Sequence, residues 1–259
     1  MESKNNGLRL PPPWIAPAAG KPGREVQPVI TVNRRRPPAA PATGPLLFAD
    51  FGNSASYPGT GTTLTNLGSV AGVSGTLTNG PVFSPLNGGT LLLDGLNDYV
   101  QFNNAGTQLV PTTGLTIIAW ARSLNNDKWL VDGIGGNRAA AGYALAADGS
   151  ALQFYVNNRP VANPGGNFNN QWGMFSGVWV PSTSMTLRRN GTVLVTANTT
   201  IPATIGTPTA PLRWGARATN QDYTNGAISI IKVIGAALSQ AELAAEYETF
   251  RGRFGLPAL

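Results

Sequence analysis

Proline is concentrated at one end of the chain, and this limits what that end can fold into. Ten of the 21 prolines lie within residues 1–45, including the runs at 11–13 and 37–38. Proline fixes φ and removes a backbone donor, so this segment cannot form a helix or a central strand. We therefore predict that residues 1–45 form an extended basic arm, partly polyproline II, and that residues 46–259 form one domain.

Basic residues are also concentrated in this arm. It holds seven basic and two acidic residues, a net charge of +5, whereas residues 46–259 hold eleven and ten, a net charge of +1. The arginine run at 34–36 could bind phosphates, but no interleaved aromatic residues or nucleic-acid module accompany it. An acidic protein surface is the favoured partner, nucleic acid is not expected, and a merely solvated linker stays open.

Apolar residues of the arm add points of attachment. Trp14 follows three prolines and could anchor in a partner's pocket. Residues 26–32 are the one β-like stretch of the arm; Pro28 bars them from a central strand, but they could add to the edge of a neighbour's sheet. The candidate partner-binding residues are Trp14, Val29, Ile30, Val32, Arg34, Arg35 and Arg36.

The residue types that the chain lacks exclude several chemistries. It has no Cys and no His, so disulfides, Ser-His-Asp and Cys-His triads and the usual zinc sites are excluded. Glycan-cleaving enzymes need a cluster of acids, yet no Glu occurs between residues 26 and 241. We predict no enzymatic activity and no cofactor. No apolar run reaches the ~18 residues that span a bilayer, and no secretory signal opens the sequence, so no membrane partner is expected.

Short apolar segments separated by Gly, Asn and Asp predict an all-β domain of two antiparallel sheets. Asp148-Gly149 and Asn190-Gly191 predict tight hairpins. Ser239 and Glu242 have the spacing of a capping box, and Leu243, Tyr247 and Phe250 would form one apolar helix face. Residues 52–89 are expected to be a long loop region with a possible strand at 75–78. The other predicted strands are 46–51, 90–93, 99–102, 115–122, 128–132, 143–146, 151–156, 172–180, 185–189, 192–195, 212–215 and 227–234.

Two groups of side chains are candidate ligand-binding residues. Asp94, Asn97 and Asp98 are weak candidates for a calcium site, with Asp222 as a remote partner, but Asp and Asn are also good turn formers and the turn is favoured. Tryptophans could stack on sugar rings; Trp120, Trp179 and Trp214 lie in apolar strands, where burial in the core is favoured. Trp129 and Trp172 stay open.

Five motifs in a fixed order resemble the concanavalin A-like, laminin G-like jelly-roll family. They are LLDGLNDYV at 92–100, LTIIAW at 115–120, LRRNGTVLV at 187–195, GAISIIKVI at 226–234 and ALSQAEL at 237–243. The resemblance covers about residues 46–255 and implies a jelly-roll β-sandwich with one short C-terminal helix. The chain departs from the family at Trp172-Gly173-Met174, which lacks the usual His, and at Ser229, where an acid is usual.

Further segments are similar to the versions of this domain in tailed-phage virion proteins. They are SYPGTGTT at 56–63, LTNGP at 77–81 and RGRFGL at 251–256. This resemblance implies a virion protein made in the host cytoplasm. We expect a homo-oligomeric decoration or cement protein on the capsid exterior, held by its arm to the major capsid protein or other virion proteins. The alternative is a lectin-like receptor-binding component of a tail or tail fibre, whose partner would be a host surface glycan.

Overall fold

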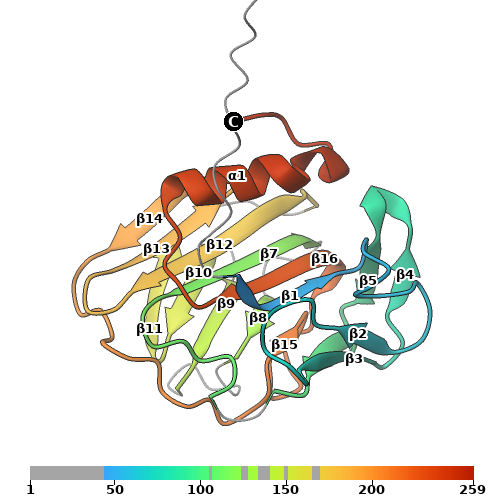
Figure 1. Ribbon diagram of the computed structural model, residues 1–259, viewed down its shortest axis with the longest axis horizontal. Coiled ribbons are helices and arrows are strands. Elements are labelled where there is room, and N and C mark those ends of the chain that lie inside the picture. The colour runs from blue at the N-terminus through green and yellow to red at the C-terminus, as the bar shows by residue number, and fades with distance from the viewer. Residues whose placement is uncertain (1–43, 105–106, 124–127, 134–140, 149–150, 165–169) are drawn as a thin grey trace, which may run out of the picture. The chain divides into compact units, whose positions relative to one another are not determined.

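Two antiparallel sheets pack face to face in the computed structural model, which describes residues 44–104, 107–123, 128–133, 141–148, 151–164 and 170–259 (Figure 1). The predicted all-β jelly-roll sandwich with one short C-terminal helix is confirmed. Almost all of the predicted arm lies outside the described residues, so its extended form and the division of the chain at residue 45 stay predictions. Among the described residues, no helix is long and apolar enough to cross a membrane.

The first sheet, sheet A, has the order β14-β13-β12-β7-β16-β5-β4, and β1 also pairs with β16. Its strands are β1 (Pro45–Asp50), β4 (Val82–Ser84), β5 (Thr90–Asp94), β7 (Leu115–Ser123), β12 (Gly173–Val180), β13 (Ser184–Arg189), β14 (Thr192–Ala197) and β16 (Asn225–Ile234). The short 3-10 helix η1 (Leu86–Gly88) links β4 to β5.

The second sheet, sheet B, has the order β11-β10-β9-β8-β15-β6-β3-β2. Its strands are β2 (Thr63–Thr65), β3 (Ser74–Thr78), β6 (Tyr99–Phe102), β8 (Lys128–Asp132), β9 (Tyr143–Asp148), β10 (Ala151–Val156), β11 (Arg159–Asn163) and β15 (Arg213–Trp214). Because β5 belongs to sheet A and β6 to sheet B, the turn between them carries the chain from one sheet to the other.

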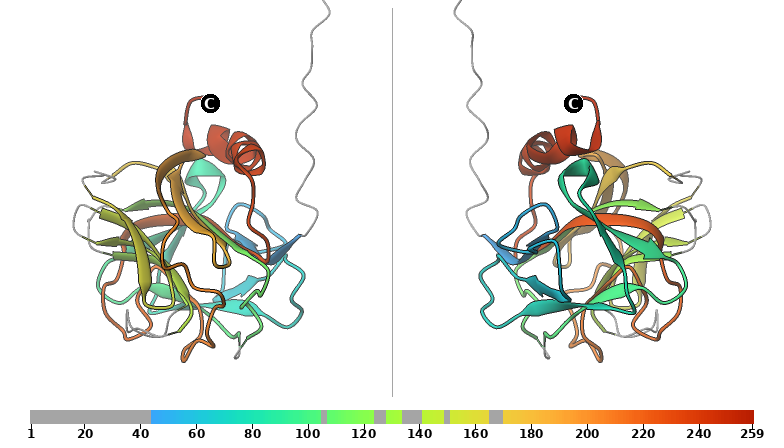
Figure 2. Two further views of the ribbon diagram at one scale, coloured as in Figure 1. Left: turned by 90° about the vertical axis from the view of Figure 1, so that its left-hand side faces the viewer. Right: turned by 90° about the vertical axis from the view of Figure 1, so that its right-hand side faces the viewer.

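The central strands of sheet A are buried on both faces. The inner face of the sheet packs against sheet B in the main core, which includes Trp179 and Trp214. Its outer face is covered by α1 (Gln240–Phe250), which lies across the strands outside the sandwich (Figures 1 and 2). A second core that includes Trp120 and Tyr247 fills this space. Burial on both sides explains why the central strands β12 and β16 are almost continuously apolar rather than alternating.

The helix begins as its sequence predicts. The Ser239 hydroxyl accepts from the Glu242 backbone N–H, and the Glu242 carboxylate accepts from the Ser239 N–H, which completes the capping box. Leu243 and Tyr247 are buried. After Phe250 the chain tightens into the 3-10 helix η2 (Arg251–Phe254), which the left-handed Gly255 ends.

Both predicted hairpins are present. Asp148 pairs with Ala151 across the first turn. At the second turn Arg189 pairs with Thr192, and Asn190 and Gly191 both have positive φ, at 50° and 77°. Two consecutive positive φ angles are typical of the type I′ turns that match the twist of the strands.

The prediction of a long loop over residues 52–89 was wrong in part. This stretch contains β2 and β4, each of three residues, as well as the possible strand that became β3. β11 was also missed. β2, β4 and β11 all lie at sheet edges. Edge strands bury few side chains, so they carry little apolar periodicity that a sequence pattern could reveal.

Candidate functional site

The carboxylates of the turn between β5 and β6 accept hydrogen bonds from the backbone of the same turn. Asp94 Oδ1 accepts from the backbone N–H of Leu96 at 2.8 Å and of Asn97 at 3.3 Å. The buried Asp98 accepts from the Asp94 N–H at 3.1 Å. The Leu96 N–H lowers the pKa of Asp94, whereas burial raises the pKa of Asp98. These contacts favour the turn-forming role over calcium.

The calcium hypothesis gains no further ligand from the residues that the structure describes. Within the described ranges, no group of three or more Asp, Glu, His or Cys side chains is placed to hold a metal ion. Asp222, the remote partner considered from the sequence, forms an ion pair with Arg217 at 3.3 Å instead.

A pair of tyrosines lies beside this turn and was not found from the sequence. Tyr99 directly follows Asp98 and begins β6, and its ring centroid lies 6.3 Å from that of Tyr223. Both rings are half-buried. Through Tyr223, the fold therefore brings the segment that contains Asp222 next to the 94–98 turn, although more than 120 residues separate them.

Arg213 of β15 packs on the Tyr99 ring. Its guanidinium lies 4.3 Å from the centre of the Tyr99 ring, a cation–π contact. It also donates to Gln101 Oε1, to the Arg217 carbonyl and to Asn220 Oδ1, at distances from 2.7 to 3.1 Å. We call Tyr99, Arg213, Arg217, Asp222 and Tyr223 the tyrosine face.

The tyrosine face has the composition of a polar-ligand site. Two rigid rings offer apolar surface with hydroxyl groups at their tips. The partly exposed Arg217–Asp222 ion pair supplies groups that can donate and accept hydrogen bonds, while the buried Arg213 is bonded within the fold and fixes the Tyr99 ring from below. The sequence signal was weak because each residue is ordinary alone, and only the pairings of β6 with β15 and of β5 with β16 bring them together.

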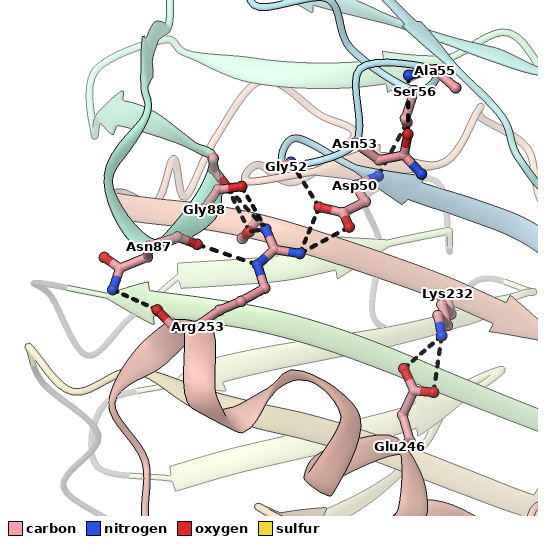
Figure 3. Close-up of polar contacts among 12 residues, drawn as sticks. Asp50, Gly52, Asn53, Ala55, Ser56, Asn87, Gly88, Lys232, Glu246 and Arg253 are labelled. Carbon is pink, nitrogen blue, oxygen red and sulfur yellow. Dashed lines mark hydrogen bonds and ion pairs between the residues drawn. The ribbon is translucent and has the colours of Figure 1, made fainter.

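A second polar cluster, around Arg253, is structural (Figure 3). Arg253 Nη1 donates to both carboxylate oxygens of Asp50, at 2.8 and 3.0 Å. Its other donors bind the carbonyls of Asn87, Gly88 and Gly89 and the Ser229 hydroxyl. Ser229, which stands where an acid is usual in the family, thus contacts the same guanidinium that Asp50 neutralises. This guanidinium has no donor left for a ligand.

The described carboxylates all have structural partners. Asp132 is fully buried and accepts from the Ala218 N–H at 2.7 Å. The remaining pairs are Asp50 with Arg253, Asp222 with Arg217, Glu246 with Lys232, Glu248 with Arg251, and Glu242 with the Ser239 cap. Together with the turn carboxylates of Asp94 and Asp98, these are the acidic side chains that the structure describes.

The tryptophans divide as the sequence suggested. Trp120, Trp179 and Trp214 are fully buried, so their predicted place in the core is confirmed. Trp172 is half-buried, with its ring centroid 4.6 Å from that of Phe254 and Arg122 6.0 Å above it. The Trp129 side chain lies outside the described residues, as do the arm candidates Trp14, Val29, Ile30, Val32, Arg34, Arg35 and Arg36.

Residues 94–244 match the family model of the concanavalin A-like lectin/glucanases superfamily, in its Laminin_G_3 form. The chain belongs to this superfamily. A comparison with curated proteins found no match.

Solved structures with this fold include binding domains of bacterial toxins. The binding domain of Paraclostridial Mosquitocidal Protein 1 has a TM-score of 0.63 at 12% identity, over 83% of this chain and 55% of that one. The botulinum neurotoxin serotype G binding domain has a TM-score of 0.60 at 12% identity, over 79% and 51%. The serotype D ligand binding domain, in complex with N-acetylneuraminic acid, has a TM-score of 0.59 at 11% identity, over 79% and 50%. This chain thus spans about half of each, and at such identities the likeness shows the fold alone.

Proposed function

We propose that this protein is a non-enzymatic glycan-binding protein and that the tyrosine face is its binding site. The observation that carries the proposal is the pair of half-buried rings of Tyr99 and Tyr223, held beside Arg213 on one surface. A sugar ring can lay its apolar face on an aromatic ring while its hydroxyls bond to neighbouring polar groups.

Two further facts support binding without catalysis. The superfamily includes both lectins and glucanases, and glycan cleavage requires an acid and a second carboxylate that face the same bond. The described carboxylates of this chain are instead bonded within turns, a helix cap and ion pairs, or, for the buried Asp132, to a backbone N–H. One structural neighbour, of which this chain spans half, is a ligand binding domain in complex with N-acetylneuraminic acid, and this supports a search for a sugar ligand.

A glycan array with the full chain tests the proposal. Tyr99→Ala and Tyr223→Ala should each weaken binding to the preferred glycan at least ten-fold, a loss of about 1.4 kcal/mol, while Tyr223→Phe keeps most of the affinity because the ring remains. Thermal unfolding of each variant checks that the fold is intact. Binding that survives both alanine variants, but disappears in Trp129→Ala or Trp172→Ala, would place the site elsewhere.

A second candidate function rests on the charge distribution. The arm carries +5 and the rest of the chain +1, so attraction to an acidic surface would be focused on the arm, and its prolines limit the entropy lost on docking. These features support a role as a capsid decoration or cement protein in a virion, attached to the major capsid protein or another virion protein through the arm.

Deletion of residues 2–45 tests this second role. The shortened protein should no longer join virus particles, and labelled antibody against the full chain should locate it on the capsid shell rather than on the tail. If the shortened protein decorates particles at normal occupancy, the arm is only a linker and the folded domain makes the attachment.

A further inference from the structure

An apolar hollow of about 300 Å³ opens between the β1–β2 loop and the β4–η1 connection. In its wall the Tyr57 ring contacts the rings of Phe51 and Phe83, with centroids 5.2 and 5.5 Å away. The rest of the lining is Gly52, Ser54, Pro58, Gly59, Pro85, Gly88 and Gly89. None of the described residues that line it is charged, and its volume lies at the small end of the range for ligand pockets.

The hollow has few polar groups left for a ligand. The carbonyls of Gly88 and Gly89 accept from Arg253, and the Gly52 N–H donates to Asp50 (Figure 3). The Tyr57 hydroxyl donates to the Gly61 carbonyl. A sugar ring would bury several hydroxyls here without partners, at a cost of a few kcal/mol. The lining therefore favours an uncharged apolar ligand over a glycan.

The apolar surface continues past the hollow. Val82 and Leu86, which flank the lining residues Phe83 and Pro85, are 61% and 72% exposed. β4 is an edge strand whose described partner is β5 alone. An apolar surface that continues from the hollow along a sheet edge suits an extended peptide that places one large side chain in the hollow. It suits a small molecule less well.

We propose that this hollow binds residues 11–14 of a second copy of the chain, with Trp14 seated against Tyr57 and Phe83. The segment reads Pro-Pro-Pro-Trp and carries no charge, as the lining requires. Aromatic-lined grooves bind proline-rich segments because polyproline II loses little entropy on docking. Trp14 is the one tryptophan of the arm, and tryptophan is a common anchor of interfaces.

The length of chain allows this contact between copies. Thirty residues separate Trp14 from Gly44, where the described residues begin, and an extended chain of that length reaches up to ~100 Å. Since the ligand and the hollow are different surfaces, two copies can exchange arms in a closed dimer, or each copy can bind the next one head to tail. The proposal is independent of glycan binding at the tyrosine face.

The test uses two full-length variants with complementary defects. Trp14→Ala removes the ligand but leaves the hollow, whereas Ser54→Arg fills the hollow from an exposed loop position but leaves the arm. The wild-type chain should show concentration-dependent association in analytical ultracentrifugation, and each variant alone should associate at least ten-fold more weakly. An equimolar mixture of the two should recover a heterodimer, because one variant supplies the hollow and the other the ligand.

Val193→Arg is the matched control, since it places an arginine on an exposed apolar residue of the opposite edge strand, β14. It should leave association unchanged, and all variants should unfold at similar temperatures. The proposal is overturned if the wild-type chain stays monomeric, if the mixture gives no heterodimer, or if Val193→Arg weakens association as much as Ser54→Arg does.

Discussion

Arg253 and Asp50 join the two ends of the domain. They are separated by 203 residues, and the guanidinium donates to both oxygens of the carboxylate. Only 7% of the Asp50 side chain and 22% of the Arg253 side chain are exposed. The same guanidinium binds the η1 carbonyls, so one side chain fixes β1, η1 and the C-terminal segment together (Figure 3).

Arg253→Ala should therefore destabilise the fold strongly. The substitution leaves the buried Asp50 carboxylate without its cation, and breaking a buried pair in this way costs about 3–5 kcal/mol. Chemical denaturation of the purified chain measures the loss. Arg251→Ala is the matched control, because Arg251 pairs with the more exposed Glu248 and should contribute less than ~1 kcal/mol. Equal losses in the two variants would show that the Arg253 cluster is not a structural centre.

Gly177 of β12 marks a close approach of the two sheets. A Cβ built there would lie 2.3 Å from Cδ2 of Phe154 in β10, inside the main core. Gly177→Ala should cost about 1–3 kcal/mol, because the ring must move in a packed interior. Gly252→Ala serves as the control, since nothing lies within 4 Å of its Cβ position, and its midpoint of unfolding should change little.

The sequence allowed much of the fold to be predicted. Asn190-Gly191 and the Ser239–Glu242 capping box are local signals, and each corresponds to the predicted element. Three-residue edge strands such as β2 and β4 carry no comparable signal. The approach of Phe154 to Gly177 is set by how two sheets stack, which no local pattern records.

Less of the candidate site could be predicted from the sequence. The Asp94–Asp98 turn was found because its residues are adjacent, but its neighbour Tyr223 comes from a segment far along the chain. Only the registers of β6 with β15 and of β5 with β16 bring these segments together. The ion pair between Arg253 and Asp50 likewise depends on the tertiary fold, so it could not be predicted from the amino-acid composition.

Ser239→Ala should weaken the attachment of α1 to sheet A. The serine hydroxyl is the cap that satisfies the Glu242 N–H, and loss of such a cap costs about 1 kcal/mol. Glu242→Gln should be milder, because a glutamine side chain can still accept from the Ser239 N–H. The free energies of unfolding of the two variants give the comparison. A larger loss in Glu242→Gln than in Ser239→Ala would contradict the described role of the cap.

Asp94 and Asp98 share one turn, but their ionisation should affect the stability of the fold in opposite directions as pH changes. Burial raises the pKa of Asp98, so its ionisation opposes folding, and this cost appears as pH rises through the folded-state pKa. Asp98→Asn removes the charge but keeps an oxygen that can accept from the Asp94 N–H. It should stabilise the chain at about pH 7 and have little effect at about pH 3.

Asp94→Asn should act in the other direction. The Leu96 N–H lowers the pKa of Asp94, so the ionised carboxylate stabilises the fold above its ordinary pKa, and this contribution is lost as pH falls through the folded-state pKa. The substitution should destabilise the chain at about pH 7 and converge with wild type in acid. Midpoints of thermal unfolding for the three proteins across this pH range provide the measurement. If both variants shift the midpoint in the same direction from wild type at neutral pH, burial does not distinguish the two carboxylates.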